Sequence, residues 1–166
     1  SGERVPTLER LFAFLKGYRG RLYLEMKGSP AEVSALSETV AGILRRTELL
    51  SQIVAKSFKL EAVEKIKTLL PEVATAALFA PKILTVLRKQ SRIIERARAH
   101  LADELSLHYS LATEKLVRQA AAEKMPTAIW TADHPIWVRR AADIGIHAII
   151  TNNPARLLAK RLELES

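Results

Sequence analysis

The stretch Leu22-Tyr23-Leu24-Glu25-Met26-Lys27 decides the fold class of this chain. Its first three residues are apolar, as in a strand buried within a parallel sheet. Glu25 and Lys27 are two residues apart, so their side chains leave the strand on the same face, and Gly28 and Pro30 then end it. An acid and a base at the end of a buried strand are costly to desolvate unless they pair or bind a ligand. The stretch therefore indicates either a plain salt bridge or a functional site.

On both sides of this stretch, short apolar runs alternate with helical patterns, which is typical of a parallel α/β fold. The expected strands cover 21–27, 52–57, 73–78, 104–108, 127–131 and 146–151. The expected helices cover 8–15, 31–46, 59–70, 112–124, 135–144 and 154–162, with one or two more within 81–101. Because no linker or low-complexity segment interrupts the pattern, we expect residues 1–166 to form a single domain.

The composition restricts the class of protein. A hydrophobic fraction of 48% argues against disorder. The absence of cysteine excludes disulfides and thiolate metal sites, and it suits a cytoplasmic location, with secretion left open. Since no apolar run reaches the roughly 18 residues that span a bilayer, we expect no transmembrane segment.

The net charge of +8 raises the question of an anionic partner. Much of the charge lies in helical patterns, as at Arg96 and Arg98, where a solvated helix face is the ordinary explanation. Aromatic residues are few and are not interleaved with the basic ones, so a base-stacking surface is not expected. We therefore expect no nucleic-acid partner.

Several segments resemble motifs of the glycerophosphodiester phosphodiesterase family, and they occur in the family's order. Residues 1–9 are similar to the family's "ipTLeE" segment, Leu24–Lys27 to its "iEiK" strand, and Ile53–Phe58 to its "iisSF" strand. Ile129–Thr131 and Ile146–Pro154 resemble the closing "vWT" and "vDgiiTnrP" segments. The resemblance implies a (β/α)8 TIM barrel.

Other family motifs are absent: His-Arg-Gly, Glu-Asn-Thr, a Glu-x-Asp pair and a His-Asp pair. In the family these precede the "ipTLeE" segment, so the resemblance identifies this chain as the C-terminal part of such a barrel. It would supply about six of the eight strand-helix units. A complete barrel takes about 250 residues, so we expect an N-terminal segment or a partner chain to supply the remaining strands. An open doubly wound sheet is the alternative if the 166 residues are the whole protein.

The resemblance also implies roles for individual residues. Glu25 matches a metal-binding carboxylate of the family, which would hold Mg²⁺ or Ca²⁺ through oxygen ligands. Lys27 matches a catalytic lysine that stabilises the phosphate oxygens. Trp130 matches the tryptophan that lines the pocket near the glycerol moiety, and Phe58 is a second candidate for substrate binding. His108 follows an expected strand and is a candidate acid or base, although the family's histidines for that role lie upstream.

The function implied by the resemblance is metal-dependent hydrolysis of a small-molecule glycerophosphodiester to an alcohol and glycerol 3-phosphate. Because the chain holds one of the family's metal-binding carboxylates and none of its catalytic histidines, we expect it to be inactive on its own. One alternative is a lysophospholipase D-type reaction, for which the apolar segment Ala76–Pro81 is either part of the core or a loop that accommodates the acyl chain. The other is a non-catalytic protein or fragment that binds phosphodiesters.

Overall fold

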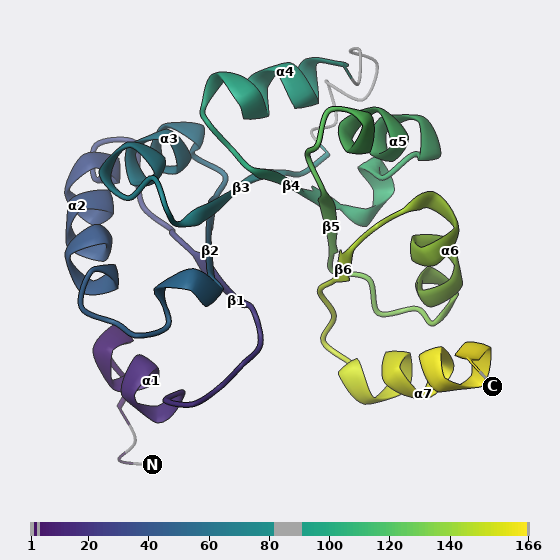
Figure 1. Cartoon of the computed structure of the whole chain (residues 1–166), viewed down its shortest axis with the longest axis horizontal. Helices are drawn as coiled ribbons and strands as arrows, with labels where there is room; N and C mark the ends of the chain where they lie inside the picture. Colours follow the sequence, from purple (N-terminus) through teal and green to yellow (C-terminus); the bar gives the residue numbers. More distant parts are fainter. Residues whose placement is uncertain (1, 3, 82–90, 166) are drawn as a thin grey trace.

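The computed structural model describes residue 2, residues 4–81 and residues 91–165, in which strands and helices alternate (Figure 1). The strands are β1 (Leu22–Glu25), β2 (Ile53–Ser57), β3 (Ala74–Phe79), β4 (Glu104–His108), β5 (Thr127–Trp130) and β6 (Ala148–Ile149). The helices are α1 (Leu8–Phe14), α2 (Val33–Leu44), α3 (Leu60–Leu69), α4 (Ser91–Ala99), α5 (Glu114–Ala122), α6 (Ile136–Ile144) and α7 (Pro154–Glu165). Two short 3-10 helices, η1 (Leu50–Gln52) and η2 (Tyr109–Leu111), precede β2 and follow β4.

The strands form one parallel sheet whose order is β1-β2-β3-β4-β5-β6. The sheet curls into a half-barrel with the helices outside, and β1 and β6 border its open side (Figure 1). A doubly wound sheet would reverse its strand order at a switch point. Since each strand here lies beside its successor, that alternative is wrong and the barrel class is confirmed.

Local sequence explains where several helices begin and end. The Thr7 hydroxyl accepts a hydrogen bond from the Arg10 amide at the start of α1, and Thr113 does the same for the Leu116 amide at the start of α5. Gly145 ends α6 in the left-handed conformation, with φ of 83°, which glycine adopts at little cost. None of the helices in the described residues is long and apolar enough to cross a lipid bilayer.

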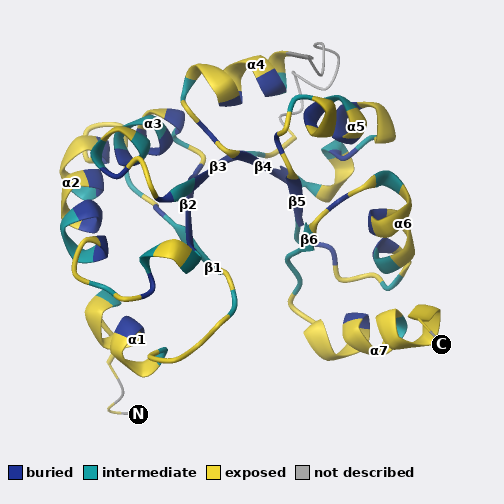
Figure 2. Ribbon diagram, in the orientation of Figure 1, coloured by how far each residue is buried: buried dark blue, intermediate teal, exposed yellow. Residues whose placement is uncertain are grey.

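The main core lies between the sheet and the helices, and Figure 2 shows the buried faces of the helices turned toward the strands. Alternate residues of each strand point outward into this core. Examples from neighbouring strands, each at most 1% exposed, are Ala55, Ala77, Leu105 and Ile129. The opposite set of residues points into the barrel, so the register of the strands decides which polar side chains meet there.

The expected elements match the structure with three differences. The sixth strand is expected over 146–151 but covers only Ala148–Ile149, since Thr151 and Asn152 bond to the Asp133 carboxylate instead of continuing the ladder with β5. The expected helix from Ser91 is α4, whereas 82–90 lie outside the described residues. Of the two interpretations of Ala76–Pro81, the core is right and the loop is wrong, since the buried strand β3 runs through Phe79.

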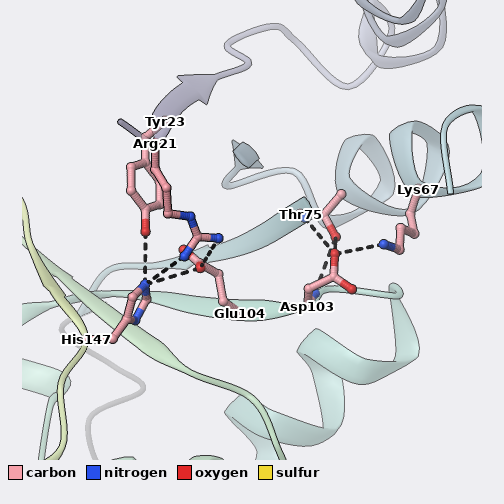
Figure 3. Close-up of polar contacts among 7 residues, drawn as sticks. All are labelled: Arg21, Tyr23, Lys67, Thr75, Asp103, Glu104 and His147. Carbon is pink, nitrogen blue, oxygen red and sulfur yellow. Dashed lines mark hydrogen bonds and ion pairs between the residues drawn. The ribbon is translucent and has the colours of Figure 1, made fainter. Parts of the chain in front are cut away.

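A polar cluster, here called the interior clasp, joins the two edges of the half-barrel (Figure 3). It consists of four residues: Arg21 just before β1, Tyr23 in β1, Glu104 at the start of β4, and His147 just before β6. A Glu104 carboxylate oxygen lies 3.4 Å from Nη2 of Arg21 and 3.4 Å from Nε2 of His147. The Tyr23 hydroxyl lies 3.1 Å from the same imidazole nitrogen. The clasp therefore connects β1 to β6 through the barrel interior.

A second polar cluster holds the start of β4 against β3 (Figure 3). The Asp103 carboxylate accepts hydrogen bonds from the Lys67 ammonium at 2.9 Å and from the Thr75 amide at 2.7 Å. It thus ties α3, β3 and β4 together at the end of the barrel opposite to the carboxyl ends of the strands.

Candidate functional site

The carboxyl ends of the strands bring most of the predicted site residues to one side of the half-barrel. Glu25 at the end of β1 pairs with Lys56, Lys56 with Ala76, and Ala76 with Glu104, which begins β4. Paired residues of parallel strands point to the same face of the sheet, so this row runs from the carboxyl end of β1 into the barrel interior. In such barrels the loops and residues at the carboxyl ends of the strands form the active site.

Glu25 and Lys27 form an ion pair, with 3.7 Å between the ammonium and a carboxylate oxygen. The Glu25 side chain is 28% exposed and the Lys27 side chain 79% exposed. An ion pair with an exposed lysine contributes little to stability. Lys27 is therefore free to turn toward a ligand at small cost, while Glu25 is held at the end of β1.

Lys56 is a charged residue of the interior that sequence reasoning missed. It is 6% exposed, and its ammonium lies 5.5 Å from the centre of the Tyr23 ring. Burial lowers the pKa of the Lys56 ammonium, and the carboxylates of Glu25 and Glu104 oppose this shift. The one signal in the sequence is a lysine within an otherwise apolar strand.

Phe58 and Trp130, the two predicted substrate-binding residues, lie next to each other. Their ring centres are 5.4 Å apart with the planes nearly perpendicular. The His108 ring packs against the same indole at 5.3 Å, again nearly perpendicular. The indole N–H donates to the carbonyl of Ser106 at 3.1 Å, which fixes the orientation of Trp130. Phe58 is 47% exposed, so this aromatic group faces solvent at the mouth of the barrel.

The loop after β5 is fastened to the loop after β6. The Asp133 carboxylate accepts hydrogen bonds from the Thr151 hydroxyl and from the Asn152 amide, both at 2.7 Å. These two hydrogen bonds lower the pKa of Asp133, and the one from the Thr151 hydroxyl has the larger effect. Thr151 and Asn152 therefore shape the rim of the site through Asp133.

Ser57 ends β2 but points away from the barrel interior. It is 1% exposed, and its hydroxyl donates to the Met26 carbonyl at 2.8 Å and accepts from the Lys59 amide at 3.1 Å. It joins β1 to β2 and supports the start of α3. Its role is structural.

The residues present do not make a complete cation site. Within the part of the chain that the structure describes, no three His, Asp or Glu side chains are grouped so that they could hold a metal ion. Glu25 offers one carboxylate, whereas hard cations take six or more oxygen ligands, some of them water. Further ligands would have to come from outside the described residues.

A groove of about 260 Å³ lies away from this site, between α1 and α2. Its lining residues all belong to the helical layer and the segment that follows α2, and they include Phe12, Ile43 and Leu49. No strand end contributes to it. The groove is therefore separate from the candidate site at the barrel mouth.

Comparisons with known proteins agree with this geometry. The sequence model of the glycerophosphoryl diester phosphodiesterase family matches residues 1–156. A candidate glycerophosphodiester phosphodiesterase of Bacillus subtilis, YhdW, is 24% identical over 155 residues, which are 92% of this chain and 60% of that protein. Glycerophosphodiester phosphodiesterase GDPD4 of Arabidopsis thaliana is 25% identical over 92% of this chain and 45% of its own length. The chain thus spans about half of these relatives.

The fold is shared with solved structures. A glycerophosphodiester phosphodiesterase from Parabacteroides distasonis superposes with a TM-score of 0.82 at 19% identity, covering 99% of this chain and 67% of its own. A phosphodiesterase from Oleispira antarctica, solved with its product sn-glycerol-3-phosphate, gives a TM-score of 0.79 at 18% identity. That match covers 97% of this chain and 62% of the Oleispira chain.

Proposed function

Because the chain belongs to the glycerophosphoryl diester phosphodiesterase family, we propose that its parent protein hydrolyses a glycerophosphodiester to an alcohol and glycerol 3-phosphate. The observation that carries the proposal is the family match over residues 1–156, together with an acid and a base at the end of β1. The Oleispira relative, which was solved with glycerol 3-phosphate, supports the choice of product.

Lys27 is the proposed phosphate-binding residue, because its exposed ammonium follows the carboxyl end of β1. In the proposed reaction its ammonium stabilises the negative charge that builds on the phosphate oxygens. Glu25 would contribute one oxygen ligand to a divalent cation, Mg²⁺ or Ca²⁺, whose other ligands would come from outside the described residues. Such a cation neutralises charge on the phosphodiester when it is bound.

Trp130 and Phe58 supply the apolar wall of the substrate site. Their perpendicular rings present carbon surface at the barrel mouth, on which the carbon backbone of glycerol packs. The hydrogen bond from the indole to Ser106 keeps this wall in place before the substrate arrives. The wall therefore orients the glycerol end of the substrate relative to Lys27.

The proposed reaction needs more than the residues described here. The chain covers about half of its relatives, and its sheet is open between β1 and β6. A complete barrel has eight strands. We therefore attribute the proton-transfer histidines and the remaining metal ligands to a further segment of the parent protein or to a partner chain.

The proposal is tested by measuring the hydrolysis of glycerophosphodiesters by the full-length protein. Release of glycerol 3-phosphate from glycerophosphodiesters, measured with Mg²⁺ or Ca²⁺ present, is the expected result. Lys27→Met should lower kcat/KM by about 100-fold or more, as removal of one charge-stabilising donor does. Lys115→Met, at an exposed position of α5, is the matched control and should leave the activity unchanged.

Three other outcomes would contradict the proposal. Cleavage of a lysophospholipid with no cleavage of glycerophosphodiesters would assign a lysophospholipase D-type activity. Binding of a glycerophosphodiester without turnover would assign a non-catalytic role. Equal activity of the Lys27 and Lys115 variants would show that Lys27 takes no part in the reaction.

A further inference from the structure

His108 is held by its own chain in a way that decides where its ring proton lies. It ends β4 and caps the short helix η2, and its Nδ1 accepts a hydrogen bond from the Ser110 backbone N–H at 3.3 Å. The Ser110 hydroxyl lies 2.8 Å from the same nitrogen. A backbone N–H can only donate, so Nδ1 must carry a lone pair and not a proton.

The neutral ring with an unprotonated Nδ1 carries its proton on Nε2. We propose that His108 presents this Nε2–H as a fixed hydrogen-bond donor to a hydroxyl oxygen of the substrate's glycerol portion. The part of the proposal that names glycerol rests on the proposed function above, whereas the tautomer rests on the Ser110 contacts alone. His108 thereby becomes a substrate-binding residue.

The surroundings of the ring support a ligand at Nε2. In the described residues, no hydrogen-bond partner of Nε2 is present, and the ring is half-buried at the mouth of the barrel. His108 pairs with Trp130 in the sheet, and the two rings are in contact at 5.3 Å. A molecule that packs against the Trp130 indole therefore lies within reach of the His108 donor.

The same contacts argue against a role in proton transfer. A general base needs an unprotonated nitrogen that faces the substrate. Here the unprotonated nitrogen faces Ser110, so no base faces the ligand. A neutral imidazole N–H is also too weak an acid to protonate a leaving group, and the more acidic imidazolium would need a second proton on Nδ1, where the Ser110 N–H points. His108 is thus suited to bind and orient glycerol rather than to exchange protons with it.

The tautomer can be read directly. Long-range ¹H–¹⁵N correlation spectra of the ¹⁵N-labelled protein distinguish a protonated from an unprotonated ring nitrogen, and His108→Phe identifies the signals of His108. We expect a protonated Nε2 and an unprotonated Nδ1 at neutral pH. A protonated Nδ1 would overturn the proposal.

Two amide variants of His108 separate its role as the cap of η2, through Nδ1, from its proposed role as a hydrogen-bond donor, through Nε2. In His108→Asn the side-chain oxygen replaces Nδ1 and keeps the Ser110 contact, but the Nε2 donor is lost. In His108→Gln the amide nitrogen reaches the place of Nε2 and keeps a donor, but the cap is lost. One hydrogen bond between uncharged groups is worth roughly 2- to 10-fold in affinity. His108→Asn should therefore weaken the binding of glycerol 3-phosphate to the full-length protein by that factor. His108→Gln should weaken it by less than about 2-fold.

The outcomes distinguish this proposal from the proposed function. If the wild-type protein releases and binds glycerol 3-phosphate while His108→Asn binds it equally well, only the role of His108 is wrong. If Gln weakens binding more than Asn, the cap matters and the donor does not, which also overturns the role. If the wild-type protein neither binds nor releases glycerol 3-phosphate, the proposed function falls, and the assignment of His108 to glycerol falls with it.

Discussion

Replacing Lys56 with methionine should stabilise the chain at neutral pH. Lys56 is 6% exposed, and its ammonium lies over the Tyr23 ring at 5.5 Å but makes no hydrogen bond or close ion pair with the described residues. Burial lowers its pKa in spite of the nearby carboxylates of Glu25 and Glu104. A lowered pKa means that the folded environment disfavours the charged form more than water does. The uncharged methionine side chain, of similar length, avoids that cost.

The size of the effect follows from linkage between folding and proton binding. Each unit by which the folded-state pKa of Lys56 lies below its ordinary value of 10.5 corresponds to about 1.4 kcal/mol. Between the folded-state pKa and 10.5 the unfolded chain binds one more proton than the folded chain. The wild-type stability therefore rises with pH in that interval, by at most about 1.4 kcal/mol per pH unit. Lys56→Met lacks this rise, so its advantage at pH 7 should shrink as the pH increases.

The assay is urea unfolding followed by far-UV circular dichroism from pH 7 to pH 10. The measurements stop at pH 10 because burial raises the pKa of Tyr23 in the folded chain. Above about pH 10, Tyr23 loses its proton in the unfolded chain but keeps it in the folded chain, so the stability falls for a reason unrelated to Lys56. Lys115→Met is the control, since that side chain is exposed. Either of two results would refute the reasoning. If Lys56→Met is less stable than the wild type at pH 7, Lys56 is instead a net stabilising partner of the two carboxylates. If the difference does not change with pH, folding does not lower the pKa of Lys56.

Three further predictions concern other parts of the fold. Glu104→Gln removes the charge at the centre of the interior clasp. We expect the free energy of urea unfolding to fall by about 1–2 kcal/mol, because Glu104 is buried but Arg21 is half-exposed. An unchanged unfolding midpoint would show that the clasp does not stabilise the fold. Ser57→Ala deprives a buried carbonyl and an amide of their partner, and thermal unfolding should report a loss of about 1–2 kcal/mol, whereas the exposed Ser34→Ala should report almost none. The pKa of Asp133 is lowered in the folded chain, so its carboxylate stabilises the fold above the ordinary value of 3.8, and this contribution disappears as the pH falls through the folded-state pKa. Asp133→Asn should therefore show a smaller loss of stability than the wild type during acid unfolding, and equal losses would count against the loop contacts of Asp133.

Much of the architecture could be predicted from the sequence. Apolar runs bounded by turn residues located the strands, and helical spacing located the helices, because both patterns depend on residues close together in the chain. Glu25, Lys27, Phe58 and Trp130 were candidates for the site since they end or follow apolar strands. The structure brings Glu25 beside Lys27 and Phe58 beside Trp130.

The interior of the half-barrel was decided by tertiary structure alone. Arg21, Lys56, Glu104 and His147 come from four distant parts of the chain, and no local pattern shows that they share one space. Their meeting depends on strand register, which sets the face of each residue, and on the curl of the sheet, which brings β1 toward β6. The proton position on His108 likewise depends on a rotamer that turns Nδ1 toward Ser110. The sequence by itself determined which elements form and in what order, whereas only the folded sheet decided which charges lie together, because electrostatic interactions depend on distances in space and not on separation along the chain.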